Sequence, residues 1–328
     1  MISKLKEGNR LTLNLILYPS LENINMAKYK VPKIQEMLDA GVHFGHQVRR
    51  WHPKMEPYIF TTSKNIHIID LEKTESMLEK ACDFLYEQAS IGKSIVFVGT
   101  KRQSKEIVEL EAKRCGAMYV NERWVGGTIT NFDTIKKNLD KLLDQIKGRE
   151  EEKFEIYTKR ERLMIDREIE KLQIAYGGIV SLKKSPDVVF VIDPKREKTA
   201  VREARRANVP VVGIVDTNAD PTEVNYPIPA NDDAIKSVAL LVKAIASAVE
   251  EGYREWGKTK KEKEEKEEKE RKEREKELEV KVEVKPEEAI IVEEKLVEEV
   301  VKEEQEKIVK ETPIEETESD KKEEKEDK

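Results

Sequence analysis

Two short segments near the middle of the chain, residues 188–192 (VVFVI) and 209–215 (VPVVGIV), show no alternation of polar and apolar positions. Strands with this pattern are typical of a parallel sheet whose two faces are both covered by helices. Residues 193–208, which lie between them, are highly charged and long enough for the crossover of about a dozen residues that parallel strands need. The pattern therefore predicts a βαβ unit, with a stripe of small side chains on its helix: Ala200, Val201, Ala204 and Ala207.

The rest of the pattern extends this unit into an α/β fold. Further strands are predicted at residues 95–98, 117–120 and 226–228, and a short strand pair at 58–60 and 66–69. Helices are predicted at residues 31–40, from Asp70 or Thr74 to about 90, through 106–110, and from Asn231 or Asp232 to about 250. We expect one α/β domain formed by residues 31–130 and 176–257.

Between these two parts, over residues 131–175, the apolar period becomes helical. One narrow stripe (Ile135, Leu139, Leu142, Leu143, Ile146) ends near Gly148, and a second helix begins at Thr158 with a capping-box pattern to Glu161. Two narrow stripes on charged helices joined by a loop predict an inserted antiparallel hairpin of the coiled-coil type. Basic residues near its tip could touch RNA or protein, or remain solvated.

The charge of the chain is unevenly distributed. Residues 258–328 hold 20 Lys and Arg against 29 Asp and Glu, and residues 1–257 hold 41 against 38. The acidity therefore belongs to a low-complexity tail, which we expect to be a solvated helix or disordered, with apolar residues returning after residue 289. The tail could also be the functional end of a charged-helix scaffold.

Residues 1–30 are expected to form a flexible extension. Their apolar run LTLNLILY is short, contains Asn14 and lacks a small-residue cleavage site, which argues against a signal peptide. Whether translation starts at Met1 or Met26 stays open. Two isolated cysteines fit a reducing cytoplasm, and no run approaches the roughly 18 apolar residues of a membrane-spanning helix.

Residues 41–55, GVHFGHQVRRWHPKM, combine positive charge with aromatic rings. Cations neutralise phosphate and flat rings stack on exposed bases, so this mixture favours RNA binding. A zinc site made of His43, His46 and His52 is an alternative, although no cysteine is near. In a structural alternative, Phe44 and Trp51 anchor the loop to the core.

Two further loops carry similar chemistry. Gly99-Thr100-Lys101-Arg102 follows a buried strand and precedes a helix, where free amides and positive charge suit a phosphate, although the P-loop motif is absent. An ordinary strand-to-helix turn would look the same. The segment 121–131, NERWVGGTITN, offers close backbone approach, hydrogen-bond donors and Trp124, which is either a stacking ring or part of the core.

Asp193 and Asp216 follow two neighbouring predicted strands, at the edge where open α/β sheets bind ligands. With Asp220 they suggest a Mg²⁺ site and, with it, a nucleotide- or Mg-binding enzyme or sensor. Asp is also a common turn and capping residue at such positions. Because no catalytic pair or complete phosphate motif appears, while basic residues recur in three loops, we favour an RNA-binding protein without catalytic activity, cofactor or resident metal.

Several motifs occur in one order: GVHFGHQ with RRWHPKM, NIHIIDLEKT, FVGTKRQ, NERWVGGTITNF, PDVVFVID, VDTNADP and IPANDDAI. In this respect the chain, from about residue 34 to 253, resembles the bacterial form of the ribosomal protein S2 family, the second protein of the small ribosomal subunit.

This resemblance implies a three-layer, flavodoxin-like parallel sheet of about five strands with a protruding helical hairpin. It also implies a structural role, in which the protein binds small-subunit rRNA between head and body and helps dock the large OB-fold mRNA-binding protein of that subunit. The rRNA-facing positions carried over by motif are His43, His46, Arg49, Arg50, Trp51, Lys54, Lys101, Arg102, Arg123, Trp124, Thr130 and Asn131.

Overall fold

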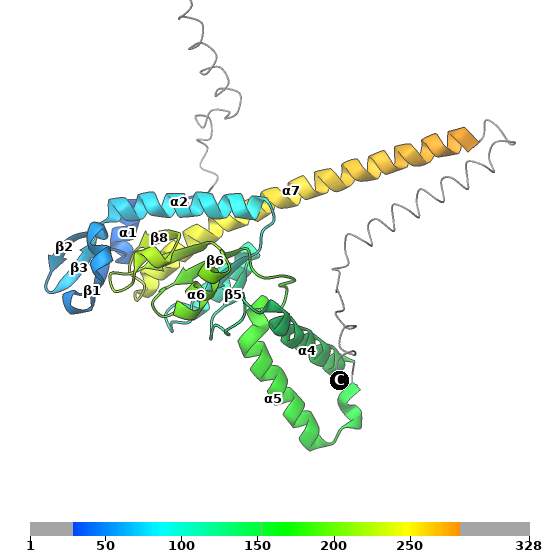
Figure 1. Cartoon of the computed structure of the whole chain (residues 1–328), viewed down its shortest axis with the longest axis horizontal. Coiled ribbons are helices and arrows are strands. Elements are labelled where there is room, and N and C mark those ends of the chain that lie inside the picture. Colours follow the sequence, from blue (N-terminus) through cyan, green and yellow to red (C-terminus); the bar gives the residue numbers. More distant parts are fainter. Residues whose placement is uncertain (1–28, 152, 283–328) are drawn as a thin grey trace, which may run out of the picture. The chain divides into compact units, whose positions relative to one another are not determined.

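A computed structural model describes residues 29–151 and 153–282. Its centre is a five-stranded parallel sheet in the order β5-β4-β6-β7-β8 (Figure 1). The strands are β4 (Ile95–Val98), β5 (Met118–Val120), β6 (Val188–Ile192), β7 (Val211–Val215) and β8 (Tyr226–Pro229). The predicted α/β architecture with a parallel sheet of five strands is confirmed.

Each central strand contributes side chains to two separate cores. In β6, Phe190 and its even-numbered neighbours face one core, while Val189 and Val191 face the other. All five residues of β6 are buried, as are all five of β7. Because successive side chains of a strand point to opposite faces, a strand buried on both faces must be apolar throughout, and this is the pattern that the sequence shows.

Helices cover both faces. The core around Phe97 and Phe190 is closed by α1 (Ile34–Ala40), α2 (Leu71–Ser90), α3 (Lys105–Cys115) and the first part of α7 (Ile235–Val282). The opposite core is closed by α6 (Lys198–Arg206), through Ala200, Val201 and Ala204, and by α4 (Phe132–Glu150) and α5 (Lys159–Tyr176). The result is the expected three-layer arrangement.

A second, smaller sheet joins β1 (Phe44–Gln47), β3 (Ile66–Ile69) and β2 (Ile59–Ser63) in that order, all antiparallel. The sequence predicts β2 and β3 but not β1. The strand β1 is followed by the short 3₁₀ helices η2 (Val48–Arg50) and η3 (Pro53–Tyr58). Its residues are exposed or half-buried, so they carry no apolar alternation that would mark a strand.

The inserted segment is a helical hairpin, in which α4 and α5 lie side by side (Figure 1). The short 3₁₀ helix η4 (Lys153–Ile156) lies between them in sequence. The predicted capping box is present: Thr158 Oγ1 accepts from Glu161 N–H and the Glu161 carboxylate accepts from Thr158 N–H. A Lys141–Glu168 ion pair links the two helices. Coiled-coil packing of this hairpin stays a prediction.

The last helix is longer than the sequence suggests, because α7 continues to Val282 rather than ending near residue 250. The chain divides into two units, residues 1–259 and 260–328. Both sheets belong to the first unit. The predicted N-terminal extension (apart from residues 29 and 30) and the tail beyond Val282 lie outside the described residues. Within the described ranges, every helix is too short or too polar to span a bilayer.

The junction of the hairpin with the sheet generates a stability prediction. A Cβ at Gly178 would lie 2.1 Å from the Tyr119 carbonyl oxygen, whereas one at Gly177 would meet only a flexible Gln173 side chain at 3.5 Å. We expect Gly178→Ala to lower the free energy of unfolding by about 1–3 kcal/mol. Gly177→Ala, at a helical φ of −54°, should be neutral or stabilise slightly. Chemical denaturation of both variants checks this, and equal effects would contradict it.

Candidate functional site

The strand β1 brings the His46 segment against the loop that follows β7. His46 N–H donates to Thr217 Oγ1 at 2.8 Å, and His52 N–H donates to the Thr217 carbonyl at 2.7 Å. A Cβ at Gly45 would lie 2.6 Å from Thr217 Cγ2. Only glycine therefore permits this close approach, and the approach places the His46 ring at the carboxyl edge of the large sheet.

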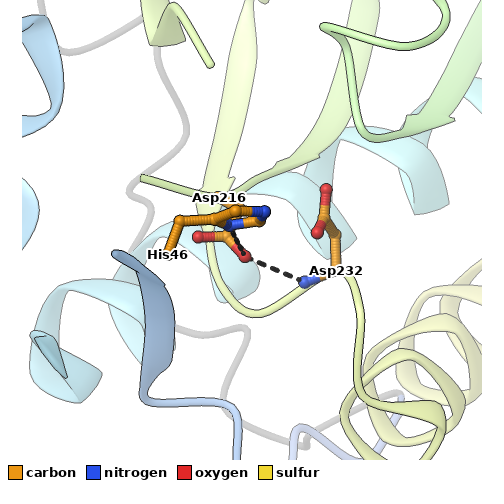
Figure 2. A group of neighbouring side chains, drawn as sticks. All are labelled: His46, Asp216 and Asp232. Carbon is orange, nitrogen blue, oxygen red and sulfur yellow. Dashed lines mark hydrogen bonds and ion pairs between the residues drawn. The ribbon is translucent and has the colours of Figure 1, made fainter. Parts of the chain in front are cut away.

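The His46 ring points at an aspartate at the end of β7 (Figure 2). Its Nδ1 lies 3.1 Å from Asp216 Oδ2, and its Nε2 lies 3.4 Å from Asp233 Oδ2. The hydrogen bond to the nearly inaccessible Asp216 carboxylate is the main cause that raises the pKa of His46, against the opposing effect of burial. The two carboxylates favour the protonated ring, and Nε2 also lies 3.0 Å from the Asn218 side-chain amide.

A second cation at this edge is enclosed by three carboxylates. Lys101 Nζ lies 2.8 Å from Asp193, 2.8 Å from Asp232 and 2.9 Å from Asp233, and its side chain is only 11% exposed. Burial alone would lower the pKa of Lys101, but the attraction of Asp232 and the bonds to Asp193 outweigh it and raise the pKa. Lys101 therefore ties together the loops after β4, β6 and β8.

Asp232 is the carboxylate of this group that is fully buried and has a strongly raised pKa. It is fully buried, and burial with repulsion from Asp216 and Asp193 raises its pKa to about 8. Its Oδ1 lies 2.8 Å from Lys101 Nζ, yet neither carboxylate oxygen has a partner in hydrogen-bond geometry among the described residues. Lys101 is thus the nearest cation to Asp232, and the His46 ring lies close by in the same cluster.

Within the described chain, one group has the spacing to hold a metal ion: His46, Asp216 and Asp232, whose candidate ligand atoms lie within 4.8 Å of one another (Figure 2). The alternatives from sequence are not assembled in this way. His43 and His52 lie elsewhere, with His52 Nδ1 accepting from Lys54 N–H. Asp193 pairs with Lys101 and Asp220 pairs with Lys54, so these acids already face cations.

The loop after β5 is shaped by a residue that sequence reasoning missed. Glu203 of α6 accepts hydrogen bonds from Gly127 N–H at 2.8 Å, Ile129 N–H at 3.2 Å and Trp124 Nε1–H at 3.4 Å. Trp124 is 6% exposed and packs in one of the two cores, as the second of the two alternatives for its ring expects. A lone Glu in a basic helix gives no sequence signal of this role.

The remaining positions predicted to contact RNA divide by exposure. Exposed are Arg49, Arg50, Lys54, Arg102, Arg123, Thr130 and Asn131, and half-buried are His43, His46, Trp51 and Lys101. The His43 ring packs on Phe44 at 4.0 Å between centroids and has a pKa lowered by burial. The Trp51 ring packs on His67 at 5.4 Å. The structure thus separates positions enclosed in the fold from positions that face solvent.

Among the described residues, the four exposed arginines of this set have no carboxylate within 4 Å, whereas Lys54 and Lys101 are both paired. Arg49 Nε donates only to the neutral Gln47 side chain, at 3.0 Å. Lys54, by contrast, lies 2.7 Å from Asp220. Among the positions predicted from sequence, the positive charge left for a ligand is therefore that of Arg49, Arg50, Arg102 and Arg123.

The chain is similar in sequence to proteins of one known family. The sequence profile of the family described as ribosomal protein S2 matches residues 37–252. The small ribosomal subunit protein uS2 of Dictyoglomus thermophilum is 49% identical over 219 residues, which cover 67% of this chain and 89% of that protein. The chain belongs to the ribosomal protein S2 family, and is thus a structural, non-enzymatic protein of the small ribosomal subunit.

Proposed function

We propose that this small-subunit protein binds rRNA through the loops at the carboxyl edge of its parallel sheet and through the adjoining small sheet. The observation that carries the proposal is the set of four exposed arginines without a carboxylate partner among the described residues, Arg49, Arg50, Arg102 and Arg123. A guanidinium that is not neutralised within the protein is available to phosphate, which it can contact through two parallel hydrogen bonds. Thr130 and Asn131, both exposed, add neutral donors beside Arg123.

The other predicted contact residues are assigned different roles. Lys101, His46 and Trp124 build the surface from within, because each is held by carboxylates or by the core. Lys54 is exposed but bound to Asp220 and Thr222, so it reaches phosphate only by exchanging partners. His43 and Trp51 are half-buried, and the Phe44 ring, 48% exposed, is the more accessible stacking surface.

The position on the subunit is proposed from family resemblance. It comprises rRNA contact between head and body, docking of the large OB-fold mRNA-binding protein, and a cytoplasmic location. The α/β domain of residues 31–130 and 176–257 would carry the rRNA contacts. The main alternative from the sequence is a nucleotide- or Mg-binding enzyme. Membership of a non-enzymatic family excludes an enzyme.

Replacing the four unpaired arginines by glutamine tests the proposal. We expect the affinity for small-subunit rRNA to fall, and the slope of log K against log salt to flatten by about 0.7 to 0.9 for each phosphate that is no longer neutralised. Filter binding across a salt series measures both quantities. Lys113→Gln is the control, since Lys113 is exposed on α3 but paired with Glu109. An unchanged slope in the fourfold variant would sink the assignment.

Lys101→Met tests whether Lys101 is a structural cation. Removing it leaves buried Asp232 without its nearest cation, and we expect a loss of about 3–5 kcal/mol in the free energy of unfolding near pH 8. The folded-state pKa of Asp232, already about 8 against an ordinary 3.8, should rise further. Between pH 3.8 and the folded-state pKa, the folded state keeps the Asp232 proton that the unfolded state has lost. The free energy of unfolding therefore falls as the pH rises over this range.

The destabilisation by Lys101→Met should therefore be smaller at pH 5 than at pH 8. Chemical denaturation at the two pH values measures it. Lys113→Met, on the exposed face of α3, is the matched control and should cost less than about 1 kcal/mol. If Lys101→Met were equally mild at pH 8, the network would not depend on this ammonium group.

A further inference from the structure

A cavity of about 580 Å³ lies at the carboxyl edge of the large sheet, outside the His46 cluster. Its lining comes from the loops after three neighbouring strands and from the first turn of α6: Thr100 after β4, Glu122, Arg123, Trp124 and Gly126 after β5, Arg196 and Glu197 after β6, and Thr199 in α6. The volume falls within the range of about 300–1,000 Å³ that is usual for small-molecule sites.

The cavity lies where the direction of chain progression reverses. From β4 the chain crosses by α3 to the edge strand β5, whereas from β6 it crosses by α6 towards β7. The two crossover helices pack on opposite faces of the sheet, α3 in one core and α6 in the other. The loops after β4 and β6 therefore diverge, and in open α/β sheets this point is the common place for ligands.

The carboxylates of the cavity are already engaged within the protein. Glu122 forms an ion pair with Lys105. Glu197 is 4% exposed and accepts from the N–H and the hydroxyl of Thr100. Burial also raises the pKa of Glu197, which favours its uncharged form.

Within the described part of the chain, the guanidinium group of Arg196 is hydrogen-bonded only to neutral groups. Arg196 Nε donates to Thr100 Oγ1 at 2.9 Å and its Nη2 donates to the Thr100 carbonyl at 3.4 Å. Among the residues that the structure describes, no carboxylate lies within the 4 Å distance of an ion pair from Arg196 or Arg123. The positive charge of the cavity is therefore the part that a ligand would have to balance.

The start of α6 adds neutral donors to these charges. Thr199 is exposed in the first turn of the helix, and the N-cap side chain, Glu197, makes no capping hydrogen bond. First-turn amides have no partner inside the helix and favour an anion. Two arginines, a hydroxyl and these amides around one hollow are a donor set suited to a phosphate ester.

We propose that this cavity binds one phosphate group of a ribonucleotide, with Arg123 and Arg196 supplying the charge and Thr199 the neutral donors. The phosphate could belong to an RNA chain or to a free nucleotide, since both present the same group. For an RNA chain the inference deepens the proposed function, on which it then rests, by naming the phosphate seat beside the arginine-rich loops.

Titration calorimetry of the full-length protein tests the inference with three probes: inorganic phosphate, adenosine 5′-monophosphate and a short single-stranded oligoribonucleotide. We expect Arg123→Gln and Arg196→Gln each to weaken binding by about tenfold or more, as for the loss of a charge-assisted hydrogen bond. Arg206→Gln is the matched control, because Arg206 is exposed at the far end of α6. It should change affinity by less than about twofold.

The three probes distinguish the possible occupants of the cavity. Binding of the mononucleotide and the oligonucleotide supports the cavity as a general nucleotide site, and binding of the oligonucleotide alone supports an RNA chain as its occupant. Absence of binding by every probe, or equal weakening by Arg206→Gln, overturns the inference. If Arg49→Gln and Arg50→Gln weaken rRNA binding while Arg196→Gln does not, the proposed function stands and the cavity assignment alone fails.

Discussion

Parallel strands end at the same edge of a sheet, so their loops bring polar groups together, and this constraint governs the whole carboxyl side of the molecule. The buried aspartates Asp216 and Asp232 follow β7 and β8, and Asp193 follows β6. Buried carboxylates are costly unless a cation faces them. Lys101 from the loop after β4 and His46 from the small sheet supply those cations, and through them both sheets and the start of α7 are joined.

The apolar pattern was sufficient for the central strands. The bounds predicted for β4 and β6 agree with the structure to the residue, because strands buried on both faces leave unbroken apolar runs. Asp70 as an N-cap and the Thr158 capping box also follow from local chemistry and are present. The elements that were not predicted, β1 and the end of α7, lack such an apolar pattern. β1 has no apolar face of its own, and the charged continuation of α7 to Val282 resembles disordered sequence as much as helix.

The sequence predicted which loops form the candidate site, but not which of their cations are enclosed and which are exposed. Lys101 and Arg102 are adjacent and read alike in the sequence, yet one is enclosed by three aspartates and the other is exposed. The difference depends on Asp232 and on Asp233, which is 132 residues away from Lys101, and no local pattern can report such partners. The same holds for Glu203, whose three bonds to the loop after β5 arise only once α6 packs beneath that loop.

These contacts divide the cations of this edge into those paired with buried carboxylates and those left exposed. Lys101 and His46 are enclosed, where a compact or titratable charge can balance buried carboxylates, whereas Arg49, Arg50, Arg102 and Arg123 are exposed and have no carboxylate partner in the described ranges. A paired cation contributes little to phosphate binding until its carboxylate is displaced, whereas an unpaired guanidinium contributes its full charge. Counting basic residues in the loops therefore overstates the charge that the proposed rRNA-binding surface offers. The pairing state of each cation, which only the fold determines, is the better guide to which of them have charge available for phosphate.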